Sequence, residues 1–268
     1  MIARQAIRSG TDMLETLARG GYAARGLVFL IIGYFAFRAA FATGRAMDSK
    51  DAIEQIFGST FGGIMICALV VALVAFSLWR FGQSLLDVDD HGTGAKGLAV
   101  RAGLFGSAIT YGALAFYAAS IVIGYGSSSD GGSGGLVAKA YEAGFGRAAT
   151  YLIGAVFAGV GGAHIVKGAK AGFMKYMSIP ERYCRWLKPV CQFGLIARGM
   201  TFLVIALLLF TGAASYREGD SPGLRAALEA MDSWPFGWLL LSLTGLGLIA
   251  FGLYGITEAF FRRVELDE

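Results

Sequence analysis

Charged residues are scarce in this sequence. Asp, Glu, Lys and Arg make up 16% of its 268 residues, whereas a soluble domain usually carries about 25%. The charges lie in clusters, and five gaps of 18 to 28 residues between them contain none. A helix that spans a bilayer needs about 20 apolar residues, so each gap is long enough to cross a membrane. The scarcity of charge argues against an ordinary soluble domain.

Cysteine and histidine are also scarce, with three and two residues. Cys67 lies in an apolar stretch, while Cys184 and Cys191 lie in a segment expected in the cytoplasm, where thiols stay reduced. Neither His91 nor His164 has metal-ligand spacing to a cysteine. A b-type haem needs a histidine pair on facing helices, and the apolar stretches supply no second histidine. The sequence therefore predicts no disulfide framework, no metal site and no cofactor.

Acidic side chains are missing from the apolar stretches, because Asp87 and Glu258 lie only at their ends. Coupled transporters commonly need carboxylates within the membrane, so this absence argues against coupled transport. No nucleophile, base and orienting group occur with catalytic spacing. The segment HGTGAKG at 91–97 lacks the glycine spacing and terminal Ser or Thr of a phosphate-binding loop. We therefore expect a protein that is not an enzyme.

Six stretches are predicted to span the membrane as helices. Five contain the charge-free gaps, and the sixth contains Arg25 and Arg38, whose head groups would have to reach outward along the helix. The expected helices cover approximately residues 22–41, 61–80, 103–124, 148–167, 195–214 and 236–257. The predicted fold class is an all-α, polytopic integral membrane protein.

The positive charges divide unevenly between the two sides that these helices define. Sixteen of the 23 Lys and Arg residues fall on the side of the N-terminus. Cytoplasmic segments carry an excess of Lys and Arg, so we expect both termini in the cytoplasm. The basic cytoplasmic face suits anionic lipid head groups. No basic domain stands free of the membrane, which argues against nucleic acid as a partner.

The six helices form three copies of one helix pair, which align on Gly21, Gly103 and Gly194. Equivalent positions in the first helices are then Arg19, Arg101 and Gln192, followed by Arg25, Ser107 and Arg198, and by Phe29, Tyr111 and Phe202. A Phe-Gly pair opens each second helix, and 21 residues after its glycine stand Gln83, Lys167 and Glu258. The spacing is kept better than the residue identities, as expected of a duplicated helical scaffold.

Each copy contributes two crossings, so the three copies are parallel repeats, and the simplest packing places them around a pseudo-threefold axis. We place the repeats at 17–90, 91–176 and 177–263, after a cytoplasmic segment at 1–16 and before a cytoplasmic tail at 264–268. Within each repeat a short amphipathic segment, at 51–57, 135–141 or 223–231, has apolar residues at helical spacing. We expect these three segments to lie on the external membrane surface and cover their helix pairs.

Three stretches carry a resemblance to a known family. They are LARGGYAARGLVFLIIG in the first repeat, FGLIARGMTFLVIALL in the third, and the closing PFGWLLLSLTGLGLIAFGLYGITEAFFRR. Over residues 17–263 the chain resembles the bacterial membrane family catalogued as domain of unknown function 1206. The resemblance implies a multi-pass protein of the bacterial inner membrane with three repeats, and it implies no activity. The second repeat departs from the pattern, because Ser107 stands where the other two have arginine.

Four arginines are candidate contacts for an anionic lipid or ligand: Arg19, Arg25, Arg101 and Arg198. In one interpretation Arg25 and Arg198 are interfacial anchors whose head groups reach lipid phosphates. Lysine should then replace either of them almost freely. In the other interpretation they form a ring that binds an anion at the repeat axis. The glycines beside them permit close helix approach and serve both interpretations.

Our leading hypothesis is a structural or accessory helix bundle that binds lipid, a membrane partner protein or a second copy of itself. The alternative is a small passive channel or transporter with a site on the pseudo-threefold axis. Such a site would need polar side chains at mid-membrane, where the candidates are Ser77, Thr110, Ser120, Thr201, Ser242 and Thr244. A membrane enzyme acting on lipid would need a pocket around residues 183–188, and nothing in the sequence demands one.

Overall fold

The computed structural model describes residues 2–41, 53–54, 58, 62–87, 89, 91–123, 146–212 and 234–263. Six long α-helices account for most of these residues: α1 (Ile2–Ala39), α3 (Gly62–Leu86), α4 (Ala95–Ile123), α6 (Gly146–Ala169), α7 (Glu181–Gly212) and α9 (Gly237–Phe261). A 3₁₀ turn, η1 (Gly172–Tyr176), lies between α6 and α7. Within the described ranges the extended backbone is limited to a single bridge between Met177 and Arg262.

All six helices are long and apolar enough to cross a membrane, which confirms the predicted all-α membrane architecture. The helices run beyond the expected spans because charged residues continue a helix outside the hydrocarbon layer. The first helix differs most. It has 38 residues, about 57 Å at 1.5 Å per residue, and the apolar span Ala18–Arg38 is only its second half.

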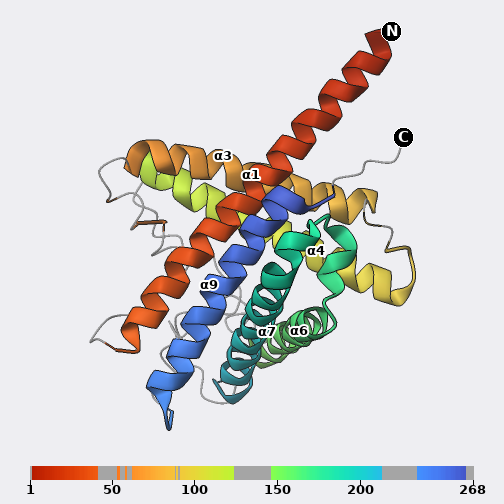
Figure 1. Ribbon diagram of the computed structural model, residues 1–268. Helices are drawn as coiled ribbons and strands as arrows, with labels where there is room; N and C mark the ends of the chain where they lie inside the picture. The colour runs from red at the N-terminus through yellow and green to blue at the C-terminus, as the bar shows by residue number, and fades with distance from the viewer. Residues whose placement is uncertain are drawn as a thin grey trace.

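The tightest helix pairs join one repeat to the next. Helix α3 packs against α4, α6 against α7, and α9 against α1, so that the last helix and the first are in contact. Figure 1 shows α1 and α9 side by side in opposite directions. Within repeats, α1 contacts α3 and α7 contacts α9, whereas α4 and α6 hardly touch.

The three pairs between repeats cross at equivalent positions. A Cβ atom on Gly26 would lie 2.7 Å from the carbonyl oxygen of Gly252, and one on Gly199 would lie 2.6 Å from that of Gly161. At the corresponding crossing of α3 and α4, the Ser77 hydroxyl donates to the Ala108 carbonyl over 2.7 Å. Small residues thus bring the backbones together in all three pairs, as in many membrane helix pairs.

The second repeat breaks this regularity. Gly21 packs against Phe76 within the first repeat, and Gly194 packs against Phe251 within the third. The equivalent Gly103 has open space where its Cβ atom would be. The bundle is therefore open between α4 and α6, and the pseudo-threefold axis stays a prediction.

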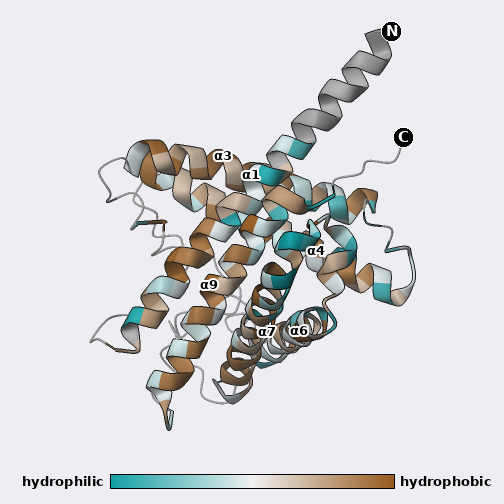
Figure 2. Cartoon of the chain, viewed as in Figure 1, coloured by the Kyte–Doolittle hydropathy of each residue, from teal (hydrophilic) through white to brown (hydrophobic). Residues whose placement is uncertain are grey.

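Large apolar side chains cover the outside of the bundle. Ile64, Phe116 and Leu152 are among the most exposed of them, and the hydrophobic colour of Figure 2 follows all six spans. Hydrophilic colour gathers where α9 ends beside α1 and where α7 begins. We call this region the basic end; it comprises residues 80–101, 164–198 and 254–263 with residues 15–25 of α1.

The predicted amphipathic segments fall almost wholly outside the described residues. In the first, Ile53 is fully buried in the core, and the Tyr117 hydroxyl of α4 donates a hydrogen bond to the Glu54 carboxylate. This part of the segment therefore packs on the bundle. The segments at 135–141 and 223–231 lie outside the described residues.

Candidate functional site

A buried ion pair joins the first helix to the last. The guanidinium of Arg25 donates through Nη2 to Oε2 of Glu258, and the two residues are 5% and 1% exposed. Arg25 therefore points into the bundle, unlike an arginine that reaches outward to lipid. The glycine crossing explains the difference, because it brings α9 so close that Glu258 competes successfully with solvent for the guanidinium.

Glu258 accepts two further hydrogen bonds from its own helix. Oε1 accepts from the Tyr254 hydroxyl at 2.8 Å and from Arg262 Nη1 at 3.0 Å. These residues stand one turn before and one turn after Glu258, so they share one face of α9. A buried carboxylate is costly unless its oxygen atoms are paired and hydrogen-bonded, and here both oxygen atoms are.

The network continues from α9 to the end of α3. Arg262 Nη2 lies 3.1 Å from each carboxylate oxygen of Asp89, and Asp89 accepts from the Gln83 amide at 2.7 Å. Burial lowers the pKa of Arg262, but Tyr22, Glu258 and Asp89 raise it by more, so the net shift is upward. Arg80 completes the network by donating through Nη1 to the side-chain oxygen Oε1 of Gln83 at 3.0 Å.

Aromatic rings fill the space between these charges. The Arg25 guanidinium carbon lies 5.3 to 5.6 Å from four ring centroids, those of Tyr22, Phe76, Phe251 and Tyr254. Such contacts add cation–π attraction when water is excluded. The Tyr254 ring also faces Lys167 of α6, whose Nζ lies 3.3 Å from the Tyr254 hydroxyl.

Arg198 occupies a different environment from its equivalent, Arg25. Its guanidinium carbon lies 4.3 Å from the ring centroids of both Phe29 and Phe202 and 5.6 Å from that of Phe251. Among the described residues no carboxylate lies within ion-pair distance of Arg198. Its charge is therefore held by aromatic faces rather than by an acid.

The repeat alignment explains this contrast. Each pair between repeats combines one member of the set Arg25, Ser107 and Arg198 with one member of the set Glu258, Gln83 and Lys167. The α1–α9 pair receives opposite charges and the α3–α4 pair receives two neutral side chains. The α6–α7 pair receives two cations. Sequence reasoning aligned Glu258 with Lys167 but treated it as a helix-end residue, so it missed the main counter-ion.

Arg19 and Arg101, two of the predicted contact residues, both bind helix ends. Arg19 donates to the carbonyl groups of Ala259 and Phe260 at 2.7 and 2.9 Å. Arg101 donates to those of Ser84 and Leu85 at 2.7 and 2.9 Å. In the third repeat the equivalent Gln192 donates to the last carbonyl groups of α6 at 2.9 and 3.2 Å. All three side chains satisfy carbonyl groups that a helix C-terminus leaves unpaired.

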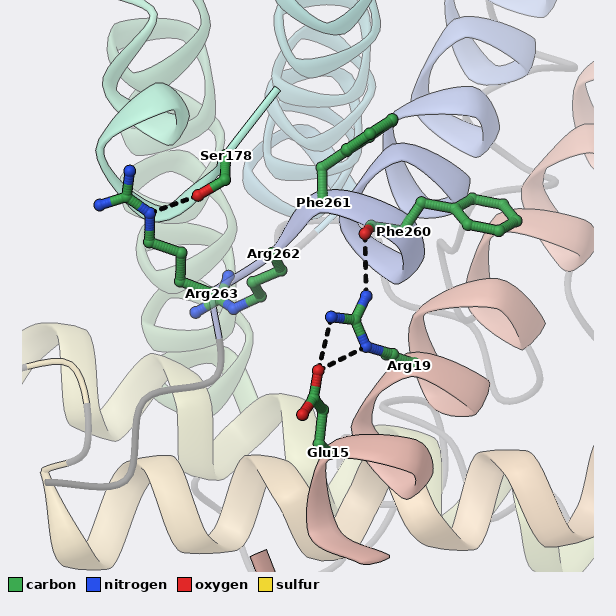
Figure 3. Close-up of a pocket in the computed structure, with 7 residues that line it drawn as sticks. All are labelled: Glu15, Arg19, Ser178, Phe260, Phe261, Arg262 and Arg263. Carbon is green, nitrogen blue, oxygen red and sulfur yellow. Dashed lines mark hydrogen bonds and ion pairs between the residues drawn. The ribbon is translucent and has the colours of Figure 1, made fainter. Parts of the chain in front are cut away.

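A pocket of about 220 Å³ lies on the surface of the basic end. Figure 3 shows the seven residues that line it: Glu15, Arg19, Ser178, Phe260, Phe261, Arg262 and Arg263. Arg263 is exposed, and its Nε donates to the Ser178 hydroxyl at 2.5 Å. Among the described residues, its Nη1 and Nη2 atoms have no hydrogen-bond partner. The pocket therefore combines three guanidinium groups with one carboxylate.

Comparison with known proteins identifies the family. The family model for Domain of Unknown Function (DUF1206) matches residues 20–87, 102–171 and 193–262. The chain belongs to the DUF1206 family. Uncharacterized protein YxxB of Bacillus subtilis (strain 168) is 31% identical over 260 residues, which cover 95% of this chain and 94% of YxxB. No solved structure matches the chain.

In this DUF1206 protein the two histidines make local contacts. Nδ1 of His164 lies 2.9 Å from the Val160 carbonyl oxygen, one turn earlier in α6, and its ring packs edge-on against Phe202 at 5.5 Å. His91 follows a turn in which the Asp87 carboxylate accepts the backbone N–H groups of His91 and Gly92 at 3.0 and 2.8 Å. Burial raises the pKa of Asp87, but these hydrogen bonds and Arg101 lower it by more.

Proposed function

We propose that this multi-pass membrane protein is a non-enzymatic helix bundle that binds anionic lipid head groups at its basic end. In this proposal the basic end faces the cytoplasm of a bacterial cell, both termini lie on that side, and the membrane is the inner membrane. The uneven division of Lys and Arg supports the orientation. In Figure 1 the start of α1 and the end of α9 lie toward the same end of the bundle, as the proposal requires.

The observation that carries the proposal is the guanidinium fork of Arg263 at the surface pocket, which has no hydrogen-bond partner for Nη1 and Nη2 among the described residues. Arg19 and Arg262 donate instead to helix carbonyl groups and carboxylates, so they form the wall of the pocket. A planar fork such as that of Arg263 matches two oxygen atoms of a phosphate. Phe260, which also lines the pocket, is 70% exposed and would offer apolar contact to the lipid.

Thermal stability in detergent tests the proposal. Phosphatidylglycerol should raise the melting temperature of the wild-type protein more than phosphatidylcholine does, because ligand binding to the folded state stabilises it. In Arg263→Gln the melting temperature should rise by nearly the same amount with either lipid. Arg185→Gln removes the same charge from an exposed position of α7 outside the pocket, and this variant should still be stabilised more by phosphatidylglycerol. If both variants show the same preference between the lipids, the assignment of the pocket is wrong.

A passive channel or transporter is a second candidate function. The observation in its favour is the cation Arg198, which has no acidic partner among the described residues, in a bundle that is open between α4 and α6. A channel or transporter must give solute flux in proteoliposomes, whereas a protein that only binds lipid need not. Flux that is absent with every small anion tested would leave the lipid-binding function as the better account.

A further inference from the structure

We propose that Arg198 binds an exchangeable phosphate-type oxyanion inside the bundle, on the side where α4 and α6 stand apart. This site is separate from the surface pocket at Arg263, and it does not depend on the proposed lipid-binding function. It is built from α7, α1 and α4.

The first argument is charge. Five cations lie in the network or share its aromatic rings, namely Arg25, Arg80, Lys167, Arg198 and Arg262, and the described carboxylates among them are Glu258 and Asp89. An uncompensated cation within a membrane is expensive. Arginine cannot relieve this cost by losing its proton. Because the described residues supply no carboxylate to Arg198, the proposed oxyanion would be its counter-ion.

The guanidinium of Arg198 lies against two aromatic rings. Its carbon is 4.3 Å from the ring centroids of both Phe29 and Phe202. The N–H donors of a guanidinium lie in its plane and suit the paired oxygen atoms of a carboxylate or phosphate. Among the described residues, none has a hydrogen bond with these donors, and Arg198 as a whole is partly buried.

The repeats differ in what they offer the arginine. In the α1–α9 pair the carboxylate of Glu258 binds Arg25, whereas the equivalent residue of the α6–α7 pair is Lys167, whose Nζ lies 3.3 Å from the Tyr254 hydroxyl. The position that supplies an oxyanion to Arg25 thus supplies none to Arg198. A bound phosphate group at Arg198 would play the part of the Glu258 carboxylate.

The side of the bundle at α4 is open. Tyr111 of α4 packs edge-on against Phe76, with 4.8 Å between the ring centroids, and among the described residues Nε of Arg25 has no hydrogen-bond partner. Gly103, two turns before Tyr111, faces open space where its equivalents pack against a second helix. In the proposal the anion exchanges on this side, where α4 and α6 make few contacts.

The test is the melting temperature of the full-length protein, measured at constant ionic strength while inorganic phosphate replaces chloride. The wild type should show a saturable rise of about 2–4 °C. Arg198→Gln should abolish this rise, and Arg198→Lys should reduce it because lysine lacks the planar fork. Arg263→Gln should keep it, which separates this site from the surface pocket.

A second variant covers the case in which Arg198→Gln does not fold. Arg198→Lys keeps the positive charge, so the protein should remain folded, and its rise in melting temperature with phosphate should be smaller than that of the wild type because lysine lacks the planar fork. If phosphatidylglycerol but not inorganic phosphate stabilises the wild type in an Arg198-dependent way, the oxyanion is a lipid phosphate that enters between α4 and α6. If neither probe depends on Arg198, or if Arg198→Lys responds to phosphate as the wild type does, the proposal is wrong.

Discussion

Arg25 and Glu258 stand 233 positions apart in the chain and form a buried ion pair that joins α1 to α9. Their contact joins the first repeat to the third, because it links the first helix of the first repeat to the second helix of the third. Tyr254 and Arg262 complete the set of donors to the carboxylate. The pair therefore holds the basic end together as well as neutralising two buried charges.

Removing the charge of Glu258 should be strongly destabilising. Glu258→Gln leaves Arg25 and Arg262 without their shared counter-ion, and breaking a buried ion pair costs about 3–5 kcal/mol. We expect the melting temperature in detergent to fall by roughly 10 °C. Glu181→Gln, at the exposed start of α7, should change it little. Similar values for the two variants would show that Glu258 is not the counter-ion of this cluster.

Arg25→Lys distinguishes the buried pair from an interfacial anchor. Lysine keeps the charge but lacks the planar fork, and at a buried site it should cost about 1.5–3 kcal/mol, the value of a hydrogen bond to a charged group. A lipid anchor would tolerate lysine almost freely. A melting temperature equal to that of the wild type would therefore favour the interfacial anchor over the buried ion pair.

Close helix contact at Gly26 predicts that alanine is destabilising there but not at Gly20 in the same helix. A Cβ atom on Gly26 would lie 2.7 Å from the Gly252 carbonyl oxygen, whereas one on Gly20 would meet no atom within 4 Å. Gly26→Ala should cost roughly 1–3 kcal/mol through overpacking. Gly20→Ala should be neutral or stabilise by up to about 1 kcal/mol through helix propensity. Thermal melts of the two variants give the comparison, and a harmless Gly26→Ala would contradict the packing of α1 on α9.

The turn after α3 should be resistant to acid. A carboxylate whose pKa is lower in the folded state stabilises that state above its unfolded pKa, and the contribution is lost as the pH falls through the folded pKa. The protection of the His91 and Gly92 amides from hydrogen exchange, relative to unstructured amides at the same pH, should therefore persist until the pH falls below about 3.9, the ordinary pKa of aspartate. Asp87→Asn should remove this acid transition, and an unchanged transition would assign it to another group.

Cysteine labelling tests the orientation. In a background without the three native cysteines, Ser129→Cys should react with an impermeant reagent added outside intact cells. Ser178→Cys, at an exposed position of the basic end, should react only after the membrane is opened. The reverse pattern would place the pocket at Arg263 on the external side and remove the basis for the cytoplasmic assignment.

The spans could be predicted from the sequence because a charge-free stretch of sufficient length has few alternatives in a membrane. The ion cluster could not, for reasons that particular residues illustrate. Glu258 lies in the last turn of α9, where its sequence position is equally compatible with solvent, and only the approach of α1 at Gly26 and Gly252 buries it. Arg25 likewise looked like an anchor because its partner lies at the other end of the chain.

The alignment of the three repeats also matches residues that form equivalent contacts in the structure, which the sequence alone did not predict. Arg19, Arg101 and Gln192 align in the sequence, and in the structure each donates to the last carbonyl groups of the helix from another repeat that packs against its own helix. The same alignment matched Gln83, Lys167 and Glu258. Pairing these positions with Arg25, Ser107 and Arg198 required knowing that each second helix packs against the next repeat, which residue spacing does not reveal.

The most direct measurement of the central claim is the lipid that stays bound to the protein. Native mass spectrometry of protein released from membranes that contain phosphatidylglycerol and phosphatidylcholine reports that lipid for each variant. We predict that the wild type and Arg185→Gln retain phosphatidylglycerol preferentially and that Arg263→Gln loses the preference. Retention of the two lipids in proportion to their abundance, or a preference that survives Arg263→Gln unchanged, would contradict a specific anionic lipid site at the basic end.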